Sequence, residues 1–372
     1  MLKKIFIFLA CCQSFLTEIM AHNDSLLNVS NVDVIGKFEG PTDIAATDRY
    51  VYVCNLVGKS VQVIDIKSNE VVTTIQDKTM TAPFKIAIIN GYAYICNLKS
   101  NKISIVDVIN NIFVKTIDED LEASNGITVA SVSGKPFAFV VDVGMLQILD
   151  LTSPKNPRVV QTYEDHHING LGVSVGEAPD YSIYVTACSD DCQGQLLAYY
   201  QIGGVYSRSP IIIDSPEIEG GRWFNAITIV RNSYAYVCDS LNDVVQVYDL
   251  KKQCYLTSID GFNTPSALTY DGAYVYVCNF TTSDDSYKGS QKIENHSMVI
   301  NVIDAARHAI KASVSGFYSP QALIAVPNAS ETFYVINASS RSNSGKTGTS
   351  DLSAGVSIFR NKSIFSSQGI FL

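Results

Sequence analysis

The stretch YVYVCNLVGKSVQVIDIKSNEVVTTI at residues 50–75 decides the fold, because the chain returns to its pattern several times. Its clearest repeats are YAYICNLKSNKISIVDVINNIFVKTI at 92–117 and YAYVCDSLNDVVQVYDLKKQCYLTSI at 234–259. Each copy reads as short strands rich in β-branched and aromatic residues, separated by polar turns. A recurring unit of about 40 residues with several short strands is typical of a β-propeller.

Seven units align on the end of the YVYVC strand. The aligned residues are Cys54, Cys96, Val141, Thr186, Cys238, Cys278 and Ile336, at separations of 42, 45, 45, 52, 40 and 58. The sequence therefore predicts an all-β fold, a seven-bladed β-propeller of four-stranded antiparallel blades. The predicted repeats cover about 41–75, 83–117, 125–163, 169–214, 225–260, 265–314 and 320–360. In the first repeat we expect strands at 42–46, 50–54, 60–66 and 71–75.

The two ends of the repeat array predict how the ring closes. Residues 32–38 (VDVIGKF) read as a fourth strand without the three that should precede it. The last unit supplies three strands and lacks its fourth. Pairing the two would close the ring with an N-terminal strand and remove the open edges. The C-terminal tail, residues 362–372, is the alternative occupant of that edge.

Residues 1–21 form the predicted signal peptide. Lys3 and Lys4 precede an apolar run, and Ala21 supplies a small residue before the cleavage point. The run is too short to span a bilayer. We expect an exported protein, periplasmic or secreted, whose residues 22–372 form a single propeller domain. The alternative is a lipoprotein anchored at Cys11, since FLAC at 8–11 resembles a bacterial lipobox.

The composition narrows the range of partners. The formal net charge is −9, and an acidic chain without a basic stripe repels the phosphates of nucleic acids. Hydrophobic residues make up 47% of the chain and charged residues 17%, a balance that favours a folded core over disorder. We therefore predict no nucleic-acid partner, no transmembrane segment and a monomer that meets a protein or a small-molecule ligand.

These motifs resemble a known repeat. The pattern YVYVCN with VQVIDIKSNEVVTTI is similar to the YVTN-type β-propeller repeat, and LQILDLTSPKNPRVVQTY at 146–163 is similar to the related LVIVD repeat. The resemblance covers about residues 30–360. It implies a propeller fold, and it leaves function open: similar propellers include surface-layer and periplasmic proteins, lactonases and portions of haem enzymes.

The cysteines divide into two groups. Cys54, Cys96, Cys238 and Cys278 occupy one repeat position in four blades, too far apart for bridges, so we expect free, buried thiols. Cys188 and Cys192 lie in the polar segment ACSDDCQGQ. Because an exported protein permits a disulfide, the sequence predicts one between these two.

The best candidate for ligand binding is the mouth of the central channel. The residues that open the innermost strands should surround this mouth, among them Asp43 and Lys85. His166 and His167 precede the innermost strand of blade 4, and Arg222 and Trp223 precede that of blade 5. These six residues are the predicted ligand-binding set, because they combine donors, charge and an aromatic face. The alternative reading of the two pairs is an ordinary loop.

A second candidate is a ring of Asn and Asp residues at the ends of the second strands: Asn55, Asn97, Asp142, Asp239, Asn279 and Asn337. Carboxylate and amide oxygens are ligands of hard cations, so a divalent metal is possible there. The alternative, which we favour, is that these side chains bind backbone groups of the following turn. Asp65, Asp107, Asp150, Asp249 and Asp304 end the third strands, and we expect them to cap tight turns.

Together these features predict an exported binding or interaction scaffold that recognises its ligand on the channel-mouth face, with no cofactor. The first alternative is a metal-dependent, lactonase-like hydrolase or lyase. The innermost strands open mostly with Asn, Ser and Gln rather than with Glu, Asp and His, which disfavours it. The second alternative is a component of a cell-surface assembly. The sequence names no ligand.

Overall fold

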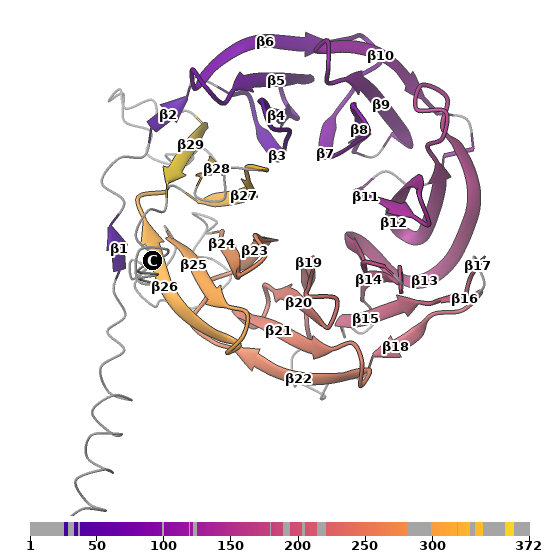
Figure 1. The fold of residues 1–372 in the computed structure, drawn as a ribbon, viewed down its shortest axis with the longest axis vertical. Coiled ribbons are helices and arrows are strands. Elements are labelled where there is room, and N and C mark those ends of the chain that lie inside the picture. The colour runs from indigo at the N-terminus through magenta and orange to yellow at the C-terminus, as the bar shows by residue number, and fades with distance from the viewer. Residues whose placement is uncertain are drawn as a thin grey trace, which may run out of the picture.

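The structure is a computed structural model, and it describes residues 26–28, 33–35, 38–98, 100–118, 120–121, 125–178, 180–188, 194–202, 205–213, 221–280, 299–317, 319–327, 332–337 and 354–360. In this part of the chain all regular elements are β-strands. The strands form seven blades arranged around a central axis, which confirms the predicted seven-bladed propeller (Figure 1). The predicted signal peptide lies outside the described residues.

Blades 1, 2 and 5 are plain four-stranded antiparallel meanders. Blade 1 consists of β3 (Pro41–Ala46), β4 (Tyr50–Asn55), β5 (Ser60–Asp65) and β6 (Glu70–Gln76). Blade 2 consists of β7 (Pro83–Ile89), β8 (Tyr92–Asn97), β9 (Lys102–Asp107) and β10 (Ile112–Ile117). Blade 5 consists of β19 (Phe224–Val230), β20 (Tyr234–Asp239), β21 (Val244–Asp249) and β22 (Cys254–Ile259). The strands of blade 1 lie within one residue of the prediction.

Blades 3 and 4 share long strands. The second and third strands of blade 3 run on as β12 (Lys135–Asp150), after β11 (Gly126–Val132). Its fourth strand continues into the first strand of blade 4 as β13 (Arg158–Val175). Blade 4 is completed by β14 (Ile183–Cys188), β15 (Gly194–Tyr199) and β18 (Ile211–Ile213), with a small hairpin, β16 (Gln201–Ile202) and β17 (Val205–Tyr206), before its last strand.

Blades 6 and 7 each contain a strand from the N-terminal region. Blade 6 consists of β23 (Pro265–Tyr270), β24 (Tyr274–Asn279), β25 (Val299–Asp304) and β26 (Ala309–Ser315), and β1 (Leu26–Asn28) adds to β26 in parallel. Blade 7 consists of β27 (Pro320–Ala325), β28 (Thr332–Asn337) and β29 (Gly355–Arg360), and β2 (Asp33–Ile35) pairs antiparallel with β29. The β2–β29 pair is the one that the predicted closure requires. The outer strand β1 was not predicted.

The core lies between blades rather than inside one sheet. Each of the seven apolar clusters of the described residues joins two neighbouring blades, and together they go once around the ring. The second strand of each blade is therefore covered on both faces, and Val51, Tyr52, Val53 and Cys54 are all fully buried. The predicted state of the four blade cysteines is confirmed: Cys54, Cys96, Cys238 and Cys278 are free and buried.

The ring has two different rims. We call the rim with the connections from second to third strands and from blade to blade the mouth rim. The opposite rim, with the turns from first to second and from third to fourth strands, is the turn rim. The innermost strands β3, β7, β11, β19, β23 and β27 surround the axis, and β6, β10, β22 and β26 lie on the outside (Figure 1).

On the turn rim, the predicted aspartate caps are confirmed. Asp65 accepts hydrogen bonds from the backbone N–H groups of Lys67 and Ser68, and Asp107 and Asp249 repeat both bonds. Asp150 and Asp304 accept the first of them, from Thr152 and Ala306. The Ser68 N–H is the main cause that holds the pKa of Asp65 below its ordinary value, as the Lys252 N–H does for Asp249. These carboxylates fold the turns.

Candidate functional site

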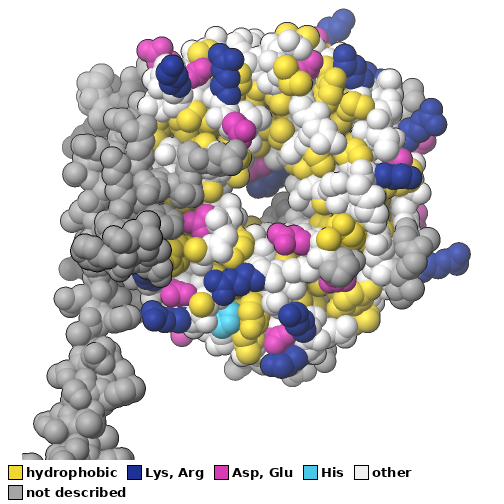
Figure 2. Space-filling view, viewed as in Figure 1, with side chains coloured by type: hydrophobic (Ala, Val, Ile, Leu, Met, Phe, Trp, Pro, Cys, Tyr) yellow, Lys and Arg dark blue, Asp and Glu magenta, His cyan; other side chains and the backbone are white. Residues whose placement is uncertain are grey.

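An opening lies at the centre of the ring, with charged side chains of both signs at its edge (Figure 2). Asp43 on β3 and Lys85 on β7, two of the predicted ligand-binding residues, form an ion pair between neighbouring innermost strands. Their charged atoms are 3.6 Å apart, and Asp43 also accepts a 2.9 Å hydrogen bond from the Ile86 N–H. Both side chains retain some exposure, 17% for Asp43 and 29% for Lys85. The pair thus ties the innermost strands of blades 1 and 2 together and leaves Lys85 partly exposed.

Arg222 and Trp223, the pair before the innermost strand of blade 5, point in opposite ways. Arg222 is buried, with 2% of its surface exposed, whereas Trp223 is 41% exposed. Of this predicted pair, Trp223 offers an exposed side chain and Arg222 does not. The sequence could not separate two neighbours, because which one turns inward depends on the blades that flank them.

The backbone around Trp223 is held on both sides. Its N–H donates to Asp239 at 3.2 Å, and its carbonyl accepts from the Ser240 N–H at 3.0 Å. Asn242 donates to Asp239 and to the Gly221 carbonyl, each at 2.9 Å. Leu241, which lies between Ser240 and Asn242 in this loop, is 43% exposed. An exposed indole and an exposed leucine therefore stand on a loop pair that hydrogen bonds fix in place.

The structure does not describe the side chains of four residues that the sequence singled out. His166 and His167 belong to β13, where the chain passes from its pairing with β12 to its pairing with β14. Their side chains are outside the described part of the structure, as are the side chain of Cys188 and the whole of Cys192. Convergence of the histidines on the mouth, and the Cys188–Cys192 disulfide, remain predictions.

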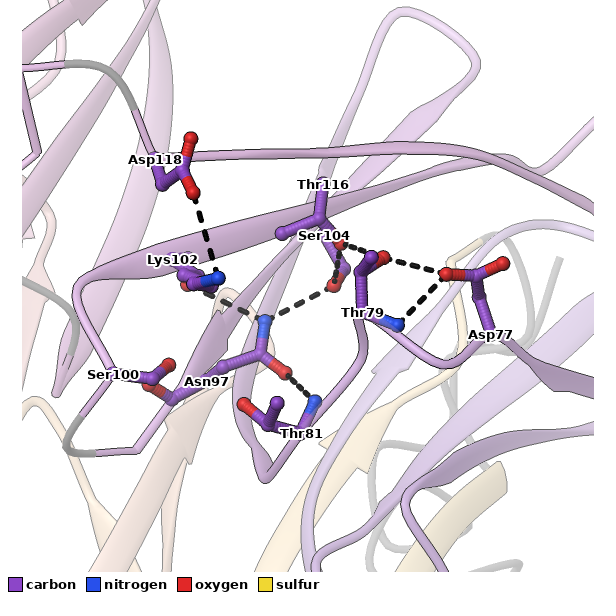
Figure 3. A network of polar contacts seen from close by, with 9 residues as sticks. All are labelled: Asp77, Thr79, Thr81, Asn97, Ser100, Lys102, Ser104, Thr116 and Asp118. Carbon is purple, nitrogen blue, oxygen red and sulfur yellow. Dashed lines mark hydrogen bonds and ion pairs between the residues drawn. The ribbon is translucent and has the colours of Figure 1, made fainter.

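The ring of Asn and Asp side chains points into the blades. Asn97 donates from Nδ2 to the Ser104 hydroxyl at 3.0 Å, and its Oδ1 accepts the Thr81 N–H at 3.0 Å (Figure 3). Ser104 in turn contacts Thr116, whose hydroxyl accepts from Thr79. The amide therefore joins three strands of blade 2 to the loop that enters the blade.

The same contact recurs around the ring. A polar residue of the third strand meets the Asn or Asp in the pairs Asn55–Gln62, Asp239–Gln246, Asn279–Asn301 and Asn337–Ser357. In blade 3, Asp142 accepts from Asn125 instead. Blade 4 lacks both partners, with the apolar Ala187 and Leu197 at the corresponding places. This joint replacement indicates that the pair acts as a unit within a blade. The sequence favoured bonds to the following turn, whereas Asn97 accepts the N–H groups of Thr81 and Ala82 in the loop that enters the blade.

The described residues contain no group of three His, Cys, Asp or Glu side chains that could hold a metal ion. The cation site at this ring thus stays a prediction without a described ligand set. Burial is the main cause that raises the pKa of the Cys54 and Cys96 thiols, so both remain protonated and poorly nucleophilic at neutral pH.

The segment GVSVG at Gly172–Gly176 matches the GxSxG pattern, which can mark a serine nucleophile. Here Ser174 lies inside β13 and pairs with Tyr184 of β14. A nucleophile of that kind needs a sharp turn between a strand and a helix, which is not the geometry of this segment. The pattern therefore supplies no catalytic serine.

The comparisons with known proteins support the fold. No family model matches the chain, and no curated protein matches it. Among solved structures, the chain is similar to Kuenenia stuttgartiensis hydrazine synthase, with a TM-score of 0.65 and 13% identity, over 90% of this chain and 99% of that chain. At this identity the likeness concerns the fold alone. The chain is a seven-bladed β-propeller. Its described residues include no helix with the length and apolar character of a membrane span.

Proposed function

We propose that this protein is an exported interaction scaffold that recognises its partner through the mouth rim. The observation that carries the proposal is the exposed Trp223 on a fixed frame. Burying an aromatic side chain in a partner gains more when its backbone is already ordered, since less conformational freedom is lost on binding. Trp is also the residue type most enriched among the residues that dominate binding energy.

The neighbourhood of Trp223 suits a contact surface. Leu241 adds a second exposed apolar side chain beside it, and Asp260 on the following loop is exposed. Asp243 accepts the Thr264 N–H at 2.8 Å, which connects this part of the rim to blade 6. An apolar centre with a polar surround is the usual anatomy of a protein interface. We extend the contact surface along the mouth rim to Lys85.

The finer parts of the proposal come from the sequence. Export rests on the signal-like residues 1–21, and membership of the YVTN and LVIVD repeat group rests on the repeated motifs. Hydrazine synthase, the similar structure, shares 13% identity with this chain, too little to carry its activity over. A metal-dependent, lactonase-like activity is the competing proposal, and a cell-surface assembly is the setting in which a scaffold of this kind would work.

The experiment compares Trp223→Ala with Leu256→Ala, which removes a side chain of similar exposure (40%) from the outer strand of the same blade. Affinity capture with immobilised wild-type and variant proteins, from cells that produce the protein, identifies proteins that depend on Trp223. Their dissociation constants should rise for Trp223→Ala by a factor corresponding to about 1–3 kcal/mol, and stay unchanged for Leu256→Ala.

Two results would overturn the proposal. Equal capture by both variants would show that the mouth rim is not the contact surface. Lactone opening that a chelator abolishes, and that Asp142→Asn or Asp239→Asn removes in a folded protein, would establish the enzyme instead.

A further inference from the structure

A cavity of about 290 Å³ opens between blades 2 and 3 on the turn rim, away from the proposed contact surface. Its walls are mostly apolar, from Ile89, Tyr94, Pro136, Leu151 and Pro154. A volume near 300 Å³ is at the lower end of small-molecule sites. It accommodates a ring or a short aliphatic chain rather than a large ligand.

The cavity has a cause in the sequence of one turn. In blades 1, 2, 5 and 6, the fourth residue after the capping Asp has a positive φ: Asn69, Asn111, Gln253 and His308, between 51° and 59°. The outer strand then begins at the next residue. In blade 3 this position is Pro154, whose ring fixes φ near −65°. Pro154 therefore cannot adopt the positive φ, and the chain turns instead through Pro154 and Lys155, with the Asn156 N–H donating to the Ser153 carbonyl at 2.8 Å. The outer part of β13 begins only at Arg158.

The longer turn changes what fills the space beside the neighbouring tyrosine. Tyr52 of blade 1 reaches the Asn111 side chain of blade 2, and Tyr334 of blade 7 reaches the Asn69 side chain of blade 1. Tyr94 of blade 2 meets no such side chain and donates to the Pro154 carbonyl at 3.1 Å. The cavity lies beside this tyrosine, where the other turns place the side chain of their positive-φ residue.

Hydrogen bonds hold the walls of the cavity. Besides the Tyr94–Pro154 bond, the Leu151 N–H donates to the Pro136 carbonyl at 3.0 Å. Lys115 donates to Asn156 at 3.0 Å and ties the far end of the turn to blade 2. The cavity is thus preformed, so a ligand does not have to order the turn when it binds.

Three exposed cations belong to the segments that line the cavity. Lys135 and Lys155 are the chain neighbours of the wall residues Pro136 and Pro154, and both are exposed, as is Arg158. The nearby anions are Asp107 and Asp150, whose oxygens also accept turn N–H groups. Lys155 lies within electrostatic range of Asp107, and Lys135 and Arg158 lie within that of Asp150. The three cations outnumber these two carboxylates, and a ligand that places a negative charge at the entrance would meet the excess positive charge.

From this geometry we infer a second binding site, between blades 2 and 3, for a small carboxylic acid with an apolar body. The apolar part enters between Tyr94, Leu151 and the two prolines, and the carboxylate stays at the entrance near Lys155 and Lys135. The site is separate from the proposed mouth-rim contact, because it lies on the opposite rim.

The test titrates the full exported protein with 3-phenylpropionate, 3-phenylpropan-1-ol and 3-phenylpropylamine, and follows the δ1 methyl signal of Ile89 by NMR. The Ile89→Val variant assigns that signal. We expect a saturable shift, with the acid binding about three- to fivefold more tightly than the alcohol, as suits an exposed ionic contact, and the amine binding most weakly.

Two variants separate the walls from the charge. Thr152→Trp should fill the cavity and abolish the shift for all three probes, while Lys155→Glu should weaken the acid at least threefold and leave the alcohol unchanged. Lys67→Glu, in the matching turn of blade 1, is the control and should change nothing. If none of the three probes produces a saturable shift of the Ile89 signal, the proposed site does not exist. Equal affinities for the acid and the amine would show that the site does not select carboxylic acids.

Discussion

The two rims of this ring use polar side chains for different purposes. On the mouth rim, Asn97 and its equivalents bind within their own blade, linking the third strand to the loop that enters the blade. On the turn rim, tyrosines of one blade bind the turn of the next: Tyr52 donates to Val108 at 2.9 Å, and Tyr236 contacts His308. The Asn and Asp side chains therefore stabilise individual blades, whereas the tyrosines connect neighbouring blades. The mouth rim also has contacts between blades, at Asp43–Lys85 and Asp243–Thr264. Loops held mainly from within their own blade can vary with little effect on the neighbouring blades, which suits recognition.

The largest expected effect concerns the connection between the first and last blades. Deletion of residues 22–40 removes β2 from β29 and also removes Phe38, which is buried in the cluster joining blades 7 and 1. Truncating a single buried Phe costs about 3–5 kcal/mol, so the deletion should lower the free energy of unfolding by at least about 3 kcal/mol. Denaturant unfolding measures this loss.

A deletion of residues 362–372 is the matched comparison for that experiment. If it destabilises the protein more than the N-terminal deletion does, the C-terminal tail closes the ring, and the pairing of β2 is secondary.

The mouth-rim contact can be broken within a single blade. Asn97→Ala leaves the buried Ser104 hydroxyl without its amide partner and releases the Thr81 N–H. We expect a loss of about 1–3 kcal/mol in the free energy of unfolding, the usual penalty for an unsatisfied buried group.

The double variant Asn97→Ala with Ser104→Val imitates the apolar pair of blade 4. Its destabilisation should be smaller than the sum of the two single effects, because the pair is coupled. Strict additivity in thermal or denaturant unfolding would mean that the two side chains do not act together.

The smallest effect is expected at a single contact between blades. Tyr52→Phe keeps the buried ring and removes the hydroxyl that bonds Val108 and Asn111 of the next blade. The expected loss is about 1 kcal/mol. Tyr50→Phe, in the same strand but with its ring at the surface edge, is the control, and a loss as large as that of Tyr52→Phe would show that the contact between blades is unimportant.

Much of the fold was predictable, because its determinants are local. The strand bounds of blade 1 follow from the alternation of apolar runs and polar turns, and the turn caps follow from Asp at the end of each third strand. The Asn and Asp ring was ambiguous at this level. Its side chains can bind a cation or a backbone group, and only their contacts in the blade distinguish the two.

The candidate site was less accessible to prediction. Arg222 and Trp223 are adjacent in a loop, and nothing in the sequence indicates that one side chain is more exposed than the other. Arg222 is nevertheless 2% exposed and Trp223 is 41% exposed. The cavity beside Tyr94 was missed altogether, although Pro154 at the place of a positive-φ residue was a visible signal. A comparison of the turns, repeat by repeat, would have found it.

The sequence by itself determined the number of blades, the free state of the blade cysteines and the chemistry of the turns, because repeat period and turn propensity act over a few residues. Only the tertiary structure decided which side chains face solvent and which cross to a neighbouring blade. Those outcomes depend on packing between strands some 40 residues or more apart, as between Tyr52 and Val108, or Tyr334 and Asn69. Burial and contact at such distances are properties of the closed ring, and no local pattern encodes them.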